Sequence, residues 1–234
     1  MTTKNSQSDP TCASCPIVNR ADRRCSRADG KAPPNCPTAL KPEMIEESRK
    51  VYTEGAFAEF ARVSSQVERA GYESAPGGGL KPARPRIVEI VDFARRMGYK
   101  KLGLIFCMGL RNEAKTAAAV FETNGFEVVS AICKVGGIPK PEIGLQPEDL
   151  LNPKHPENIC NPAMQAMIMN EANVEFNILL GLCVGHDSLA IAHAKAPVTV
   201  LAVKDRLLGH NPLSCLYLYG GYYNYLSKPL FAEK

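Results

Sequence analysis

The sequence has no tryptophan and only four histidines in 234 residues, and aromatic side chains make up 7% of it. It has no run of 18 or more apolar residues, so we expect no membrane-spanning helix and no membrane partner. Its first residues, MTTKNSQSDP, lack the apolar segment of a secretory signal, which predicts a cytoplasmic protein. Because that compartment is reducing, we do not expect disulfides.

Cysteine, in contrast, is abundant. The chain has nine, an odd number that argues against a closed set of disulfides. Four of them, Cys12, Cys15, Cys25 and Cys36, lie near the N-terminus with the spacing C-x2-C-x9-C-x10-C. Thiolates that are close in sequence can surround one metal centre. We therefore predict that these four side chains hold a metal in a cysteine-rich segment, residues 1–41, that precedes an α/β domain, residues 42–234.

The spacing of these four cysteines leaves the metal open. It matches neither the zinc pattern of two C-x2-C pairs nor the shorter run of bacterial ferredoxins. The pairs Cys15-Pro16 and Cys36-Pro37 are similar to the Cys-Pro that ends ferredoxin motifs, which is weak support for iron–sulfur. Four thiolates suit tetrahedral zinc and a 4Fe–4S cluster equally well, and both cofactors stay open.

Residues 1–41 are also basic. They hold seven lysines and arginines against three aspartates, so the whole formal charge of +4 lies in this segment. It has too few large apolar groups to fold alone, and a bound metal supplies the missing free energy. The cations compensate the negative charge of thiolates. No aromatic side chains alternate with them, so nucleic acid is not an expected partner.

The remainder reads as alternating helices and strands. A helical pattern runs from Pro42 to Gly71, a loop from Ala75 to Pro85 and a helix from Arg86 to Met97. Four apolar segments of strand length then alternate with helical patterns, at residues 102–106, 126–132, 176–182 and 198–203. Such units predict a Rossmann-like open sheet of about four mainly parallel strands with helices on both faces.

Three more cysteines follow predicted strands directly. Cys107, Cys133 and Cys183 each lie at a strand's carboxyl end, and these ends share one edge of an open sheet, where ligand crevices form. Cys160, just before a helix, can reach the same edge. A buried cysteine is often only a small apolar side chain, and we expect that of Cys215. Three at three strand ends favour a second metal site, with iron–sulfur preferred.

The turns after these strands are suited to anions. Helix N-termini and cations stabilise thiolates and anionic clusters. The residues that we expect to bind the cofactor there are Gly109, Arg111, Lys134, Gly185 and Asp187. Cys183 and His186 are the catalytic candidates, as a thiol nucleophile and as a ligand, acid or base. Asp187 has an alternative role as a helix N-cap, and Asp205-Arg206 follow the last strand and could line the same crevice.

Several segments taken together resemble a known family. They are Cys12 with Cys15, Cys25, Cys36-Pro37, GLCVGHDSL at 181–189 and VKDRLLGHNP at 203–212. The combination resembles the uncharacterised prokaryotic domain-of-unknown-function family eighteen-forty-seven, whose members are described as predicted metal-binding proteins. The resemblance implies metal binding by the four N-terminal cysteines. It implies that the 181–189 and 203–212 stretches hold site residues, and it carries over no catalytic role.

Three functions remain compatible with these patterns. The first is an iron–sulfur enzyme with reductase or sulfur-transfer activity, supplied with electrons by a redox partner protein. The second is a non-enzymatic protein that binds zinc or senses metal. The third is a thiol-dependent enzyme that uses Cys183 and no crevice metal. The Tyr-rich C-terminal end is a candidate contact surface for a homo-oligomer.

Overall fold

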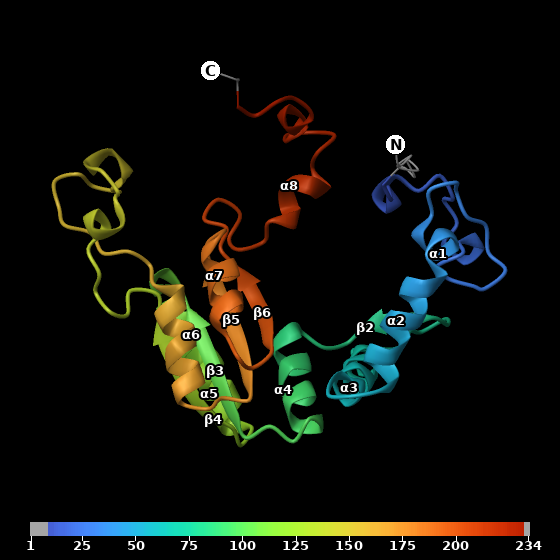
Figure 1. Cartoon of the computed structure of the whole chain (residues 1–234), viewed down its shortest axis with the longest axis horizontal. Coiled ribbons are helices and arrows are strands. Elements are labelled where there is room, and N and C mark those ends of the chain that lie inside the picture. The colour runs from blue at the N-terminus through green and yellow to red at the C-terminus, as the bar shows by residue number, and fades with distance from the viewer. Residues whose placement is uncertain (1–8, 232–234) are drawn as a thin grey trace, which may run out of the picture. The chain divides into compact units, whose positions relative to one another are not determined.

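The computed structural model describes residues 9–231 (Figure 1). The chain divides into two compact units, Met1–Gln66 and Val67–Lys234, and each is described by itself. The predicted division at residues 41 and 42 stays a prediction. Among the described residues, no helix has both the length and the apolar character needed to cross a bilayer.

The described part of the first unit consists of two 3-10 turns followed by three helices, of which the first is a single short turn. Its elements are the 3-10 turns η1 (Cys12–Ser14) and η2 (Arg20–Asp22), then α1 (Pro37–Leu40), α2 (Pro42–Thr53) and α3 (Phe57–Ala70), whose last residues belong to the second unit. We expected one continuous helical pattern from Pro42 to Gly71, and the structure corrects this. The helix stops after Thr53, and Gly55 has a φ of 74°, in the left-handed region that glycine adopts without strain.

A small hairpin follows where we expected only a loop. Strands β1 (Tyr72–Ser74) and β2 (Leu80–Pro82) pair antiparallel, and the Ala75 N–H donates to the Gly79 carbonyl at 3.0 Å. The three consecutive glycines between the strands, residues 77–79, all have positive φ. Their role is therefore to turn the chain.

The second unit is built on a four-stranded parallel sheet of order β4-β3-β5-β6. Its elements are α4 (Arg86–Arg96), β3 (Lys101–Phe106), α5 (Arg111–Thr123), β4 (Glu127–Ile132), α6 (Pro162–Glu171), β5 (Phe176–Leu182), α7 (His186–His193) and β6 (Val198–Val203). All seven residues of β5 are buried, as expected for a central strand with helices on both faces. The α/β fold class and the parallel sheet are confirmed.

Helices cover both faces of this sheet (Figure 1). Met169 of α6 and Ala190 of α7 pack with Ile105 and Leu179 on one face. On the other face, α4 and α5 lie over the alternate strand residues, since Ile87 and Ala117 line one cavity with Leu180. The two faces therefore use alternating residues of β3 and β5, as the period of a strand requires.

The strand order places a topological switch point between β3 and β5. From β3 the chain passes to β4 on one side and later returns to β5 on the other. Ligands of open α/β sheets bind at such a point, outside the carboxyl ends of the strands. Cys107 follows β3 and Cys183 follows β5, and the Cys107 N–H donates to the Leu180 carbonyl at 3.1 Å. Two of the predicted site cysteines therefore lie at the switch point.

A buried glutamine ties the strand ends together beneath these cysteines. The Gln165 side chain of α6 is fully buried, and its Nε2 donates to the carbonyls of Phe106 at 3.1 Å and Ala131 at 2.6 Å. Phe106 is the last residue of β3, and Ala131 is the last but one of β4. Among the described residues, Gln165 Oε1 has no hydrogen-bond partner. The two hydrogen bonds from the Gln165 NH2 group therefore fix the distance between the ends of β3 and β4.

The chain after β6 is mostly exposed. It includes α8 (Leu213–Tyr217) and the turn η6 (Asn224–Ser227), and Tyr222 is 90% exposed. Cys215 is half-buried and its thiol donates to the Pro212 carbonyl at 3.1 Å, so our expectation of an ordinary buried cysteine needs correction. Association of copies through this Tyr-rich segment stays a prediction.

Asp92 of α4 supports a first testable prediction. Its carboxylate accepts 2.8 Å hydrogen bonds from Arg96 in the same helix and from Arg84 before it, and these arginines lower the pKa of Asp92, Arg96 first. A lowered pKa means that the carboxylate stabilises the fold above its unfolded pKa of about 3.9, and this stability is lost as the pH falls through the lower folded value.

We expect Asp92→Asn to lower the free energy of unfolding by roughly 1 kcal/mol at pH 7. The difference in the free energy of unfolding between wild type and variant should become smaller below about pH 4, because the wild-type carboxylate then also loses its charge. Urea denaturation at several pH values measures both. Glu122→Gln, at an exposed carboxylate of α5 without an ion pair among the described residues, is the matched control. A gap that is the same at every pH would contradict the role assigned to Asp92.

Candidate functional site

The four N-terminal cysteines line one cavity. Its volume is about 90 Å³, and its walls are formed by Thr11, Cys12, Cys15, Pro16, Arg23, Cys25, Pro33, Asn35, Cys36, Pro37 and Thr38. The residues come from the beginning and the end of a stretch with little regular structure. Four thiols around one small hollow provide the donor set of a zinc or iron–sulfur site.

Two residues explain how the local chain brings these cysteines together. The Asn35 side-chain amide donates to Thr11 Oγ1 at 2.9 Å and to the Asp9 carbonyl at 3.2 Å, which holds the first two cysteines near the fourth. Gly30 lies against the backbone of Arg23, where a Cβ would meet the Arg23 carbonyl at 2.4 Å. A glycine is therefore required for the turn that carries Cys25.

The second cysteine set lies at the carboxyl edge of the sheet. We name the side chains of Cys107, Cys133, Cys160 and Cys183 the edge cluster. Cys133 is 3% exposed, and the other three are half-buried. The thiol of Cys133 interacts with those of Cys160 and Cys107, and the charge of Cys183 also acts on Cys160. Cysteines from four separate segments therefore influence one another at this edge.

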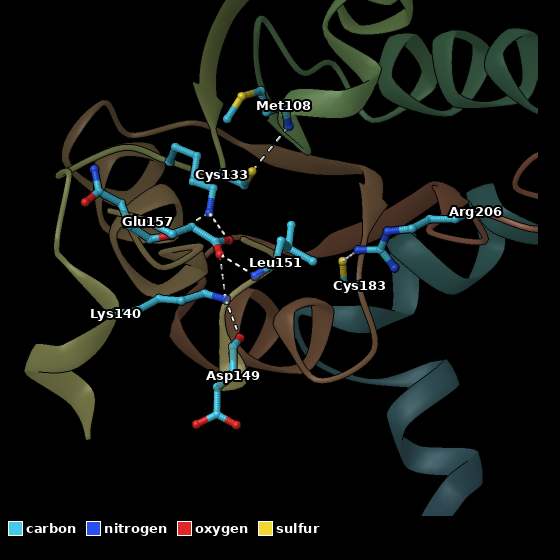
Figure 2. Close-up of polar contacts among 10 residues, drawn as sticks. Met108, Cys133, Lys140, Asp149, Leu151, Glu157, Cys183 and Arg206 are labelled. Atoms are coloured by element: carbon cyan, nitrogen blue, oxygen red, sulfur yellow. Dashed lines mark hydrogen bonds and ion pairs between the residues drawn. The ribbon is translucent and has the colours of Figure 1, made fainter. Parts of the chain in front are cut away.

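Cys133 is the centre of this cluster. Its sulfur accepts a hydrogen bond from the Met108 N–H at 3.2 Å, across the gap between the ends of β3 and β4 (Figure 2). The hydrogen bond to Cys160 and burial raise the pKa of the Cys133 thiol. The same hydrogen bond, with Cys133 as donor, lowers the pKa of Cys160 to about 7, helped by the charge of Lys134. The thiol of Cys133 therefore stabilises the thiolate form of Cys160.

Cys160 reaches the cluster because the chain between β4 and α6 closes on itself. The Asn161 N–H donates to the Cys133 carbonyl at 2.7 Å, and the Ile159 N–H donates to the Ile138 carbonyl at 2.8 Å. The segment 134–160 thus leaves and returns at one place, with Cys133 and Cys160 at its base. In Figure 1 this segment extends beyond the sheet.

Glu157 holds that segment in shape (Figure 2). Its carboxylate accepts from the Leu151 N–H at 3.0 Å and forms ion pairs with Lys140 at 3.1 Å and Lys134 at 3.7 Å. The Leu151 N–H and Lys140 lower the pKa of this carboxyl group. Because Lys134 is next to Cys133 in sequence, the ion pair links the segment to the edge cluster. This role of Glu157 depends on tertiary contacts and has no signal in the sequence.

Two cations from the chain after β6 lie over the other side of the cluster. Arg206 Nη2 donates to Cys183 Sγ at 3.0 Å (Figure 2), a bond that strengthens when the sulfur is charged. The backbone N–H of Lys204 donates to the Leu182 carbonyl at 2.9 Å, and its ammonium lies beside Gly109. Both residues lie within the 203–212 stretch, but only Arg206 was predicted as a site residue, because the reach of the Lys204 side chain has no signal in the sequence.

The predicted site residues that follow β5, Gly185, His186 and Asp187, lie at the start of α7. Gly185, with a φ of 83°, is the N-cap, and the helix begins at His186, so Asp187 is not the cap. The Asp187 carboxylate instead accepts from the Ser188 N–H at 2.8 Å. Burial lowers the pKa of His186, and the positive charges of Lys134 and Arg206 lower it further. His186 is therefore a neutral imidazole beside the cluster at pH 7.

One predicted cofactor-binding residue lies elsewhere. Arg111 begins α5 and lines a cavity of about 400 Å³ along that helix, with Lys115 and Ser130 among its neighbours. Within residues 9–231, no hydrogen bond or ion pair joins the Arg111 side chain to the edge cluster. The helical turn η3 (Met108–Leu110) intervenes between Cys107 and Arg111 in the chain.

Neither cysteine set is yet drawn together as a ligand set. Within residues 9–231, no group of three or more His, Cys, Asp or Glu side chains is arranged so that it could hold a metal ion as it stands. Metal ligation by the N-terminal cysteines and by the edge cluster therefore stays a prediction. The chemistry of the donors fits soft metals.

Comparison with known proteins places the chain in a family. The sequence model of the family DUF1847, described as a protein of unknown function, matches residues 36–201 of this chain. These residues contain all four cysteines of the edge cluster. The uncharacterised protein MJ0455 of Methanocaldococcus jannaschii is 36% identical over 197 residues, which cover 83% of this chain and 93% of that protein. No solved structure matches. The chain belongs to the DUF1847 family.

Proposed function

We propose that this protein binds metal through two sets of cysteines and that the edge cluster holds an iron–sulfur cluster at which a small molecule reacts. The observation that carries the proposal is that Cys107, Cys133, Cys160 and Cys183 lie at the carboxyl edge of the parallel sheet, around its switch point. The Met108 N–H and the Arg206 guanidinium already donate to two of the sulfurs. Hydrogen bonds of this kind stabilise thiolate-bound clusters.

We assign different roles to the edge cluster and to the N-terminal cysteines. A bound iron–sulfur cluster would supply single electrons to a molecule that lies beside it. The N-terminal cysteines, held around their own cavity, are suited to pass electrons or to stabilise the fold with zinc. His186, neutral and next to the edge cluster, is placed to accept a proton from a bound molecule. Reduction and sulfur transfer are the reaction classes that this arrangement favours.

A second candidate function rests on one contact. The 3.0 Å bond from Arg206 to Cys183 also suits a thiolate nucleophile that needs no metal. In that case Cys183 would react with an alkylating agent much faster than the other cysteines. If instead the edge cluster ligates metal, all four cysteines should become protected together when iron and sulfide are added.

The proposal is tested by anaerobic purification, followed by iron, sulfide and zinc analysis and a visible spectrum. We expect a coloured protein with metal at both sites. Cys15→Ser should remove the N-terminal share of the metal and leave the thermal unfolding of the α/β unit unchanged, because its sheet has a separate core. A colourless, metal-free protein in which all four thiols of the edge cluster react freely would overturn the proposal.

A further inference from the structure

Lys204 is an unpaired cation at the carboxyl edge of the sheet. Its residue is half-buried, and among the described residues no side-chain hydrogen bond or ion pair engages its ammonium group. The other lysine of this region, Lys134, is in contrast bound to Glu157 and to the Asn158 carbonyl. A half-buried ammonium that lacks a partner loses hydration without compensation, so it is suited to an anionic ligand.

The ammonium of Lys204 faces a small space above Gly109. A side chain at position 109 would begin 3.4 Å from Lys204 Nζ and 4.0 Å from Cys107 Sγ, and apart from its chain neighbours no other described atom lies within 4 Å of that point. The glycine thus leaves room between a cation and a thiol. Since Lys204 follows β6 and Gly109 follows β3, the lysine reaches across the end of β5, over the switch point.

The two aspartates predicted at this edge, Asp205 and Asp187, do not pair with the Lys204 ammonium. The Asp205 carboxylate accepts from the N–H groups of Leu207 and Leu208 at 3.0 and 2.8 Å, and Asp187 accepts from the Ser188 N–H. Arg206 is engaged with Cys183. One ammonium group is therefore left for one small anionic group, which favours a carboxylate over a dianion such as phosphate.

We infer that the space above Gly109 is a subsite for the carboxylate of a small organic acid, with Lys204 as its counter-ion and with the rest of the molecule directed at the edge cluster. This inference rests on the proposed function, because it names the substrate class of the same site. The subsite itself belongs to the polypeptide, and it is therefore open to measurement in protein without metal.

Two alkylating agents of nearly equal size test the subsite. Iodoacetate carries a carboxylate and iodoacetamide a neutral amide. In both reactions the cysteine sulfur attacks the CH2 carbon, iodide leaves and the thiol proton passes to solvent. The readout is the ratio of the two rates at Cys107 in metal-free, reduced protein, measured by peptide mass spectrometry, with Cys215 as the internal reference. Propionate should slow the iodoacetate reaction more than sulfate of equal ionic strength does.

We expect Lys204→Met to lower the iodoacetate-to-iodoacetamide ratio at Cys107 by about five- to tenfold, the effect of one nearby charge in a partly buried site. Gly109→Ala keeps the charge and fills the space with a methyl group, so it should lower the ratio as well. Lys195→Met, which removes an exposed charge beyond the end of α7, is the control and should change nothing. Circular dichroism establishes that each variant is folded.

The outcomes separate this inference from the proposed function. If wild type binds no metal and the ratio still depends on Lys204, the subsite stands and the metal proposal fails. If Lys204→Met loses metal and leaves the ratio unchanged, Lys204 only balances the charge of a cluster, and the inference is wrong. Stronger protection by sulfate than by propionate would overturn the assignment to carboxylates.

Discussion

Replacing Cys133 by serine is expected to empty the edge cluster of metal and to leave the N-terminal site loaded. The Cys133 thiol interacts with those of Cys160 and Cys107, and its sulfur also accepts a hydrogen bond from the Met108 N–H. An alcohol oxygen is a poor ligand for the soft metals that thiolates bind. If both sites carry equivalent clusters, the iron and sulfide per chain should fall by about half.

Cys215→Ser is the matched control, since it makes the same exchange at a half-buried cysteine outside both sets. It should keep the full metal content. A combination of Cys133→Ser with Cys15→Ser should lose all metal, because each variant removes one site. Full metal content in Cys133→Ser would mean that the edge cluster is not a ligand set, and a Cys183 thiol enzyme would then be the better account.

The sheet was the most predictable part of the molecule. The ranges predicted for β5 and β6 agree with the structure at both ends. A parallel strand with helices on both faces is apolar along its whole length, so the apolar run marks where the strand begins and ends. The break between α2 and α3 was missed, since the apolar spacing continues through Gly55 and only the backbone angle shows the stop. The β1–β2 hairpin was missed because its strands are short and exposed.

The candidate site was predictable where topology alone places a residue. Cys107, Cys133 and Cys183 follow parallel strands, so their shared edge follows from the sheet. Cys160 lies 27 positions beyond Cys133, and its place depends on the bond from the Asn161 N–H to the Cys133 carbonyl. The position of Lys204 depends on how far its side chain reaches across β5. A sequence pattern shows neither the position of Cys160 nor the reach of the Lys204 side chain.

Gly181→Ala is expected to give the largest loss of stability, and Gly181 is also the residue that directs the chain toward Cys183. It interrupts β5, where the pairing with β6 shifts register between Leu180 and Leu182, and it has a φ of 69°. A Cβ at this position would lie 1.9 Å from the Leu110 side chain, which is only 5% exposed. The alanine therefore meets both a strained backbone angle and a neighbour with no room to move.

We expect Gly181→Ala to lower the free energy of unfolding by about 3 kcal/mol, of which the left-handed backbone contributes roughly 1–2 kcal/mol and overpacking the rest. Urea denaturation of the full chain measures the loss. Gly125→Ala is the matched control, because Gly125 has a φ of 89° and no atom within 4 Å of an added Cβ among the described residues. Its loss should equal the backbone contribution alone.

The packing contribution can be isolated by making room for the methyl group. In Leu110→Ala the contacting side chain is shortened, so the further addition of Gly181→Ala should cost no more than Gly125→Ala does. The two substitutions would then show a favourable coupling in a double-mutant cycle. If Gly181→Ala costs the same with and without Leu110, the contact is not the reason for glycine. Only the backbone angle would then hold the bulge that precedes Cys183.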